Sequence, residues 1–437
     1  MADVYAPYKV NANPSAYLFD RLSVHAGHKP DVQTRSRASY VFDNAEHAPR
    51  VCTNEEARYV YSRIANPTVE VFEKRCAALE GTIILLAQSG ANIIASRNLY
   101  GGSYSCLKTL LPRLGIQVRL LDAGDRPEDV ARLIDDRTKM VFVETIGNPR
   151  CSVPNLQGMA DAAHSAGVPF VVDNTFGACG YCCRAKDHGV DIIIHSVMKW
   201  IGGHGTMVGG VVVDAGTFDW AKRPDRFPFL AKPNEALMGF CYAKQFGNTT
   251  FAIALRIDVI MESGGVLNPF AAQQLILSLE TLALRCDKIA QNSLRLARFL
   301  KQHERIAWVL YPGLPSNEGD HARAKKVLKN GFGGVLSIGI VGGNAASKHV
   351  INSFKLVSHM TSVGDSKTMA THPWSSTHVI MSESDRIAAG ITEDLIRIST
   401  GTEAIEDIEN DFIQALNTIP HDLVVDTTAI LASNLRR

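Results

Sequence analysis

Residues 169–199 read PFVVDNTFGACGYCCRAKDHGVDIIIHSVMK, and this stretch contains two short apolar runs that decide the fold class. The first run, Pro169–Asp173, ends in a carboxylate. The second, Asp191–His195, is followed closely by Lys199. Short, nearly continuous apolar runs are typical of strands buried on both faces, as in a parallel sheet covered by helices. The stretch therefore predicts an α/β protein with a mostly parallel sheet.

The same alternation of strands and helices extends on both sides of this stretch. We expect further strands at Val118–Asp122, Met140–Glu144 and Val208–Val213, with helices at Pro127–Asp135 and Leu156–Ala166. Beyond about residue 265 the pattern changes to one long helix over 268–303, a strand at Val335–Ile340 and a final helix near 404–417. We therefore predict three parts: an N-terminal arm (1–60), a large α/β domain (61–264) and a smaller C-terminal α+β domain (265–437).

The overall composition excludes several classes of protein. The 437 residues carry a net charge of +1, with acids and bases spread along the chain, which argues against nucleic acid or an anionic membrane as the main partner. No apolar run is long enough to span a membrane, and the first residues do not resemble a signal peptide, so we expect a soluble, cytoplasmic protein. The nine cysteines, including the cluster at 179–183, lack a second ligand pair for zinc, and the spacing of His372 and His378 matches no zinc site. We expect no metal.

Polar residues follow three of the predicted strands at the sheet edge where ligands bind in such folds. Asn148 follows Met140–Glu144, Asp173 ends the next strand, and Lys199 follows Asp191–His195. A lysine amine and a carboxylate are what pyridoxal 5'-phosphate (PLP) needs, for its aldehyde and its ring nitrogen. Each residue alone also fits a structural role, as a solvated lysine, a capping aspartate or a turn asparagine. No GxGxxG or Walker A motif is present, which disfavours nucleotide binding.

Motifs along nearly the whole chain resemble those of the Cys/Met-metabolism PLP-dependent enzymes. They are YSRIANPT (61–68), NLYGG (98–102), ETIGNP (144–149), VVDNTFG (171–177), HSVMKWIGGHGTMVGG (195–210), SLETLALR (278–285), YPGLP (311–315), GDSKTMATHPWSSTH (364–378) and LIRISTGTE (395–403). This resemblance implies fold type I, similar to aspartate aminotransferase. Gly364-Asp365 resembles the O-acetylhomoserine sulfhydrylase branch, whereas cystathionine synthases and lyases usually have Gly-Gly there.

The resemblance implies a role for each matching residue. Lys199 would form the Schiff base with PLP and move protons, Asp173 would pair with the ring nitrogen, and Tyr100 would stack on the ring and assist proton transfer. Asn148 would bond the phenolic oxygen. Further contacts would be Ser196, Tyr61 and Arg63 to the phosphate, and Arg397, Ser362 and Asn148 to the substrate. Because the family supplies Tyr61 and Arg63 from a neighbouring subunit, the resemblance implies a homodimer as the minimal unit and a homotetramer as the assembly.

The implied reaction is a γ-replacement on O-acetyl-L-homoserine, in which acetate leaves and sulfide, or a carbon or amine nucleophile, is added. Fungal relatives of the fusaric-acid type, which act in secondary metabolism, look similar. Two alternatives remain open: elimination of the cystathionine or methionine lyase type, and a degenerate, non-catalytic subunit.

The chain departs from the family at the phosphate-binding segment. After Gly81 relatives have a Gly-rich loop that binds the phosphate, whereas here Gly81 runs directly into TIILLAQSG. Gln88-Ser89-Gly90 could substitute, but we interpret it as a helix end before the next strand. Met198 replaces the usual phosphate-binding Thr or Ser. These departures motivate the non-catalytic alternative.

Overall fold

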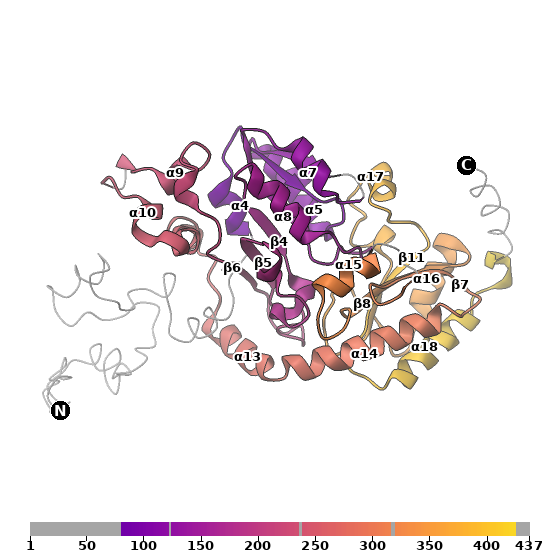
Figure 1. Ribbon diagram of the computed structural model, residues 1–437. Coiled ribbons are helices and arrows are strands. Elements are labelled where there is room, and N and C mark those ends of the chain that lie inside the picture. The colour runs from indigo at the N-terminus through magenta and orange to yellow at the C-terminus, as the bar shows by residue number, and fades with distance from the viewer. Residues whose placement is uncertain (1–79, 122–123, 236–237, 316–319, 425–437) are drawn as a thin grey trace, which may run out of the picture.

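The computed structural model describes residues 80–121, 124–235, 238–315 and 320–424 (Figure 1). The predicted N-terminal arm (1–60) lies outside these residues, as do Tyr61 and Arg63. The three-part division of the chain therefore stays a prediction. Within the described residues the chain builds two sheets joined by two consecutive helices.

The first sheet has six strands in the order β2-β1-β3-β4-β5-β6. Strands β1 to β5 are mutually parallel and β6 is antiparallel to β5. The prediction of a mostly parallel sheet is therefore confirmed. The strands are β1 (Asn92–Ala95), β2 (Gln117–Leu120), β3 (Thr138–Glu144), β4 (Phe170–Asp173), β5 (Ile192–Ser196) and β6 (Gly210–Asp214).

Successive residues of the central strands enter different cores on the two faces of this sheet. Val141 and Val143 of β3 pack with the helices α7 (Pro127–Leu133) and α8 (Leu156–Ser165). Met140 and Phe142 of the same strand pack on the other face. The elements there include α4 (Glu80–Leu86), η2 (Cys106–Leu110), α6 (Leu111–Arg113), α9 (Pro228–Ala231), α10 (Tyr242–Phe246), α11 (Thr250–Ala254) and η8 (Leu255–Ile260). The short helix α5 (Gly101–Ser105) precedes η2, and α12 (Met261–Ser263) follows η8. Burial on both faces explains why these strands are apolar throughout.

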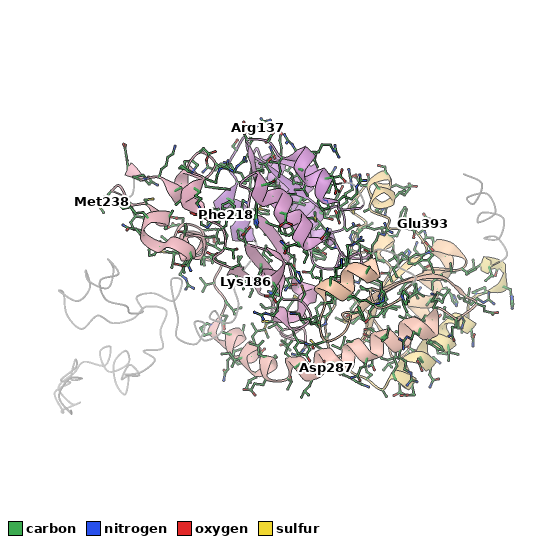
Figure 2. The ribbon with its side chains drawn as sticks, viewed as in Figure 1. Arg137, Lys186, Phe218, Met238, Asp287 and Glu393 are labelled. Carbon is green, nitrogen blue, oxygen red and sulfur yellow. The ribbon has the colours of Figure 1, made fainter. Side chains whose placement is uncertain are left out.

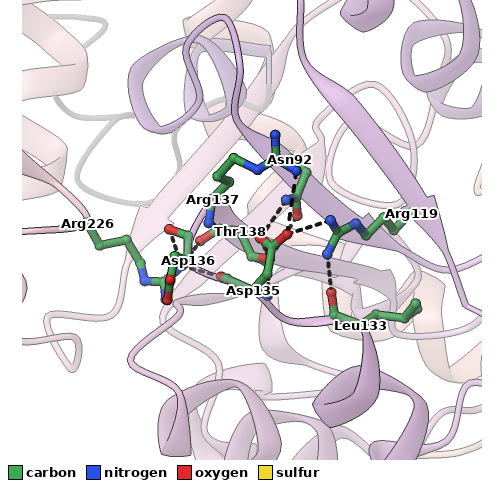
Figure 3. A network of polar contacts seen from close by, with 8 residues as sticks. All are labelled: Asn92, Arg119, Leu133, Asp135, Asp136, Arg137, Thr138 and Arg226. Carbon is green, nitrogen blue, oxygen red and sulfur yellow. Dashed lines mark hydrogen bonds and ion pairs between the residues drawn. The ribbon is translucent and has the colours of Figure 1, made fainter.

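A polar network lies at one end of the first sheet, opposite to the end where strands β3, β4 and β5 terminate (Figure 3). The carboxylate of Asp135 accepts hydrogen bonds from Asn92 (2.8 Å) and Arg119 (2.5 Å). Desolvation raises the pKa of Asp135, but these hydrogen bonds outweigh it and the pKa is lowered. Arg226 donates to the backbone carbonyls of residues 135, 136 and 138. The network joins β1, β2 and β3 at their starts, away from the predicted site.

The prediction of one long helix over 268–303 is wrong, because two helices occupy this stretch. They are α13 (Pro269–Glu280) and α14 (Leu282–Leu300), separated at Thr281, where φ is −106° and ψ is 4°. The guanidinium of Arg285 donates a hydrogen bond to the carbonyl of Ser278 (2.8 Å) and also donates to the carbonyls of Trp200 and Ile201. Arg285 of α14 thus occupies a carbonyl that an unbroken helix would bond within itself, while it also binds the segment that follows Lys199.

The second sheet has five strands in the order β7-β8-β11-β10-β9. Its strands are β7 (Ile306–Leu310), β8 (Val335–Ile340), β9 (Ser358–His359), β10 (Met369–Thr371) and β11 (Leu395–Ser399). One core packs this sheet against α14, α16 (Gly343–Ser353) and α18 (Ile405–Asn417). The remaining helices of this part are α15 (Asp320–Val327) and α17 (Glu383–Ala388).

The two sheets are held to one another by α14 and by polar contacts. Figure 1 shows α13 and α14 running along the side of both parts. The hydroxyl of Tyr181, from the segment after β4, donates to Asp287 of α14 at 2.7 Å. Figure 2 labels Asp287 at the lower side of the molecule. The carboxyl ends of the first sheet therefore face residues of the second. Within the described ranges, no helix combines the length and apolarity that crossing a membrane requires.

Candidate active site between the two sheets

The predicted site residues gather at the carboxyl edge of the first sheet. Asp173 ends β4, Ser196 ends β5, and Asn148 follows β3 after a short turn. Lys199 lies three residues beyond β5, in a turn where its N–H donates to the carbonyl of Ser196 (3.3 Å). Parallel strands end at one edge, so the fold brings these side chains together.

Lys199 projects towards the second sheet and is partly buried. Its Nζ donates a hydrogen bond to the hydroxyl of Ser362 at 2.8 Å. Burial, and then the positive charge of Arg397, lowers the pKa of Lys199 to about 8, against the opposing effect of Asp365. At pH 7 this amine is still mostly charged, but a far larger fraction of it is uncharged than of an ordinary lysine, and the uncharged form is the one that attacks a carbonyl carbon.

This lowered pKa predicts a distinct pH profile for the acylation of Lys199. Only the neutral amine reacts, so the rate should rise through pH 7, reach half its maximum near pH 8 and level off above pH 9. Lysines with the ordinary pKa of about 10.4 should keep gaining reactivity beyond pH 10. Brief labelling with an amine-acylating reagent, followed by mass mapping, measures both profiles in one sample. A profile for Lys199 that coincides with those of the exposed lysines would contradict the prediction.

Tyr100 lies at the start of α5 with its side chain 49% exposed, on the rim of the site. Two glycines follow it because no side chain fits there. A Cβ at Gly102 would lie 2.5 Å from Cε1 of the Tyr100 ring, and one at Gly101 would lie 2.0 Å from the carbonyl oxygen of Thr377. The NLYGG motif thus lets the tyrosine ring lie close against its own helix.

Arg397 reaches the site from β11, the middle strand of the second sheet, and is 1% exposed. Its Nη1 donates to Oδ1 of Asn148 (3.2 Å), and its Nη2 donates to the carbonyls of Thr361 (2.8 Å) and Ser362 (2.9 Å). Its Nε–H has no partner among the described residues. A buried donor without a partner is rare and favours a ligand that can accept a hydrogen bond. Burial lowers the pKa of Arg397 to about 10, so the group stays charged at neutral pH.

Thr175 connects two of the predicted residues, although its sequence context gave no reason to single it out. Its N–H donates to Oδ1 of Asp173 (2.8 Å), and its Oγ1 accepts from the backbone N–H of Ser196 (2.8 Å). The ends of β4 and β5 are therefore held together by one threonine. A second residue that the sequence analysis missed is Glu144, whose side chain lies beside Asp173 in the strand register.

Two cavities meet at this edge. The smaller, of about 150 Å³, is lined by Tyr100, Glu144, Ile146, Asn148, Asp173, Thr175, Phe176, Ser196, Met198, Lys199, Thr361, Val363 and Arg397. The larger, of about 410 Å³, shares Tyr100, Asp173 and Ser196 with it. Most other residues on its wall are apolar or glycine, and no Lys or Arg of the described residues lines it. The structure thus brings all seven predicted residues that it describes into one site, with Ser362 present through its bond to Lys199.

The segment Gln88-Ser89-Gly90 lies away from these cavities. It connects α4 to the start of β1, and the N–H of Gly90 donates to the carbonyl of Gly115 (2.8 Å). Since the site lies at the carboxyl ends of the strands, this segment is at the wrong edge to bind a ligand there. The interpretation of Gln88–Gly90 as a helix end before a strand agrees with the structure.

Comparisons with known proteins agree with this geometry. The family model described as Cys/Met metabolism PLP-dependent enzyme matches residues 20–417. The sulfhydrylase FUB7 of Fusarium oxysporum f. sp. lycopersici is 46% identical over 420 residues, covering 91% of this chain and 96% of the relative. The homocysteine synthase of Schizosaccharomyces pombe is 47% identical over 421 residues, covering 91% and 98%.

A solved structure from Campylobacter jejuni subsp. jejuni has the same fold. That protein is assigned as an O-acetylhomoserine (thiol)-lyase, and its structure contains a pyridoxyl-lysine 5'-monophosphate. It superposes with a TM-score of 0.83 at 29% identity, covering 91% of this chain and 99% of its own. The expected fold class, fold type I of the PLP enzymes, is thereby confirmed.

Proposed function

Because this chain belongs to the Cys/Met-metabolism family of PLP-dependent enzymes, we propose that it catalyses a γ-replacement on O-acetyl-L-homoserine, with sulfide as the nucleophile and homocysteine as the product. The names of its relatives support this choice, since they include a sulfhydrylase, a homocysteine synthase and an O-acetylhomoserine (thiol)-lyase. The single observation that carries the proposal is the meeting of Lys199, Asp173 and Arg397 around one small cavity.

The described residues fit the ring of PLP better than its phosphate. Lys199 offers an amine with a lowered pKa, Asp173 a carboxylate on the cavity wall and Tyr100 an aromatic face. For the phosphate, the larger cavity offers the hydroxyl of Ser196 but no cationic side chain. Its wall also carries His195, whose Nδ1 is buried without a partner and whose pKa burial lowers to about 4, so this histidine is neutral at pH 7. We propose that Tyr61 and Arg63 of a second subunit supply the missing contacts, in a homodimer or homotetramer.

When bound, PLP withdraws electrons from the α carbon of an attached amino acid and so permits loss of a proton from carbon. The chain's own residues then have separate tasks. Arg397 holds the substrate carboxylate with its planar donors. Lys199 takes and returns protons at the α and β carbons, with Ser362 holding its amine. Asp173 keeps a proton on the ring nitrogen, because a neighbouring anion favours the charged form. Asn148 would bond the phenolic oxygen of PLP, and Tyr100 would cover its ring and assist proton transfer.

The decisive experiment follows acetate, homocysteine and keto acid in one reaction. The purified chain is first incubated with PLP, and visible absorbance confirms that the cofactor has bound. O-acetyl-L-homoserine is then added with and without sulfide. We expect homocysteine and acetate in equal amounts, and only when sulfide is present. Keto acid and ammonia without sulfide would identify a lyase, and a chain that never acquires visible absorbance would be a non-catalytic subunit.

A carbon or amine nucleophile in place of sulfide is a finer proposal of the same kind. It would make this chain an enzyme of secondary metabolism. Release of acetate with such nucleophiles at a higher kcat/KM than with sulfide would support it.

A further inference from the structure

Glu144 is a buried acid in the site that the proposed reaction does not use. It ends β3, is 6% exposed and lines the smaller cavity. In the register of the first sheet it lies directly beside Asp173 of β4. Neighbouring strands are about 4.8 Å apart, so two carboxyl groups share one buried edge.

This placement is unfavourable for the fold. Burial, and then the charge of Asp173, raises the pKa of Glu144 well above its ordinary value. Like charges side by side on a sheet destabilise it, and a neutral side chain of similar volume would avoid the desolvation as well. No Lys or Arg among the described residues forms a hydrogen bond or ion pair with Glu144 that would offset this. The reason for a buried acid at this position lies in the contacts of its two carboxyl oxygens.

Each carboxyl oxygen accepts a backbone hydrogen bond from a different segment of the site. Oε1 accepts from the N–H of Tyr100 at 2.6 Å, and Oε2 accepts from the N–H of Asn148 at 3.1 Å. Tyr100 begins α5 after β1, whereas Asn148 belongs to the turn after β3. One side chain therefore joins the two segments whose residues stand on the wall of the smaller cavity.

The bond to Tyr100 matters because it is the one that its backbone N–H makes, while its carbonyl accepts from Tyr104 at 3.0 Å. Its ring is half exposed, and its backbone N–H cannot bond within α5 because it precedes the first turn. Asn148 in turn contacts Arg397 through Oδ1. A shift of Glu144 would therefore also displace Tyr100, Asn148 and, through Asn148, the guanidinium of Arg397.

We infer that Glu144 is a positioning residue, whose carboxyl group fixes the separation of Tyr100 and Asn148 across the smaller cavity. The inference rests on the proposed function for its effect on rate, but not for its effect on the two segments. Glutamate is required because each of its two oxygens accepts, whereas glutamine offers one acceptor and would set an N–H₂ group against a backbone N–H.

The test compares Glu144→Gln with a matched control, Asp411→Asn. Asp411 of α18 is also a buried acid, and its carboxylate accepts backbone hydrogen bonds from Lys355, Leu356 and Val357, none of which lines either cavity. Both variants are measured as the full chain, by hydrogen exchange with mass detection and by steady-state kinetics. Exchange without cofactor reports on the two segments directly, even if the proposed reaction is not observed.

For Glu144→Gln we expect faster exchange in peptides that contain Tyr100 and in those that contain Asn148, both by at least about tenfold. We expect kcat to fall by roughly 10- to 100-fold, as small misplacements of positioning groups do, while KM changes less than about threefold. Asp411→Asn should speed exchange near 355–357 only and leave kcat unchanged. Wild-type exchange in both Glu144 segments together with wild-type kcat would overturn the inference, as would equal effects of the two variants on kcat.

A second measurement does not depend on how well the variant folds. In the unaltered protein the amides of Tyr100 and Asn148 should exchange more slowly than an unstructured chain predicts, because each donates to a buried carboxyl group. Exchange of either amide at the unprotected rate would refute the tether between them.

Discussion

Replacing Lys199 with methionine is expected to reduce the rate of acetate release from O-acetyl-L-homoserine by at least about 10³-fold, within the range seen when a group that transfers protons in the reaction is lost. Methionine keeps the length and apolar stem of the side chain but has no amine. The loss should appear in kcat, because binding of the substrate carboxylate through Arg397 is left intact. Acetate release measured at saturating substrate provides the test.

The control for Lys199→Met is a lysine in a comparable environment elsewhere. Lys139, in β3 near the polar network, is partly buried, and burial lowers its pKa too. Lys139→Met should leave kcat within about twofold. In Lys199→Ala, which leaves space, added methylamine should restore part of the lost rate. No rescue, with a loss no larger than that of Lys139→Met, would remove Lys199 from the proposed chemistry.

The Lys199→Met variant should be more stable than the unaltered protein when no cofactor is bound. At pH 7 the folded protein holds a mostly charged, partly buried ammonium at Lys199, which methionine removes. Between about pH 8 and the ordinary lysine pKa near 10.4, only the unfolded chain keeps this proton, so the stability of the unaltered protein rises with pH there. The advantage of Lys199→Met in thermal unfolding should therefore be largest near pH 7 and shrink towards pH 10.

The sequence predicted the sheet well because its central strands are apolar on both faces. Strand β3 and the ends of β4 and β5 were located from that pattern alone, which placed Asp173 and Lys199 at one edge. Strand β1 was expected only as the strand after Gln88–Gly90 and its bounds were not predicted, since NIIA is only four residues long and follows a helix that is just as apolar. The break at Thr281 was also missed. Beside it Arg285 bonds the carbonyls of Ser278, Trp200 and Ile201, and contacts of this kind leave no local signal in the sequence.

The site residues that the sequence predicted differ from those that it missed in the same respect: only the former have a local signal. Lys199 and Asp173 were located together at the ends of predicted strands, and Arg397 came from the family motif LIRISTGTE, whereas Glu144 looks like any acid that ends a strand. Glu144 opens the motif ETIGNP, but the motif suggests no role for it, because its partners are backbone N–H groups, which every residue has. Thr175 escaped notice for the same reason. The apolar wall of the larger cavity is likewise a property of folding, since Ile83, Leu107 and Val208 are distant in sequence.

Replacing Arg397 with lysine is expected to raise KM for O-acetyl-L-homoserine by about 100-fold or more, with a smaller fall in kcat. The guanidinium makes three hydrogen bonds within the site and keeps an unpartnered Nε–H beside the cavity. A lysine ammonium has three donors at one point and cannot span these acceptors while binding a carboxylate. Losing two charge-assisted bonds, each worth about 1.5–3 kcal/mol, corresponds to at least about 10²-fold in affinity.

Arg226→Lys provides the matched control, because Arg226 is 5% exposed and also binds three backbone carbonyls, at the opposite edge of the first sheet. That variant should unfold at a lower temperature without a change in KM. A substrate analogue without the carboxylate, the acetate ester of 3-aminopropanol, separates the two roles of Arg397. The unaltered enzyme should strongly prefer O-acetyl-L-homoserine over this analogue, and Arg397→Lys should lose most of the preference. If the preference survives, the substrate carboxylate is bound by another group, since a guanidinium that only supports the backbone of Thr361 and Ser362 cannot distinguish the two compounds.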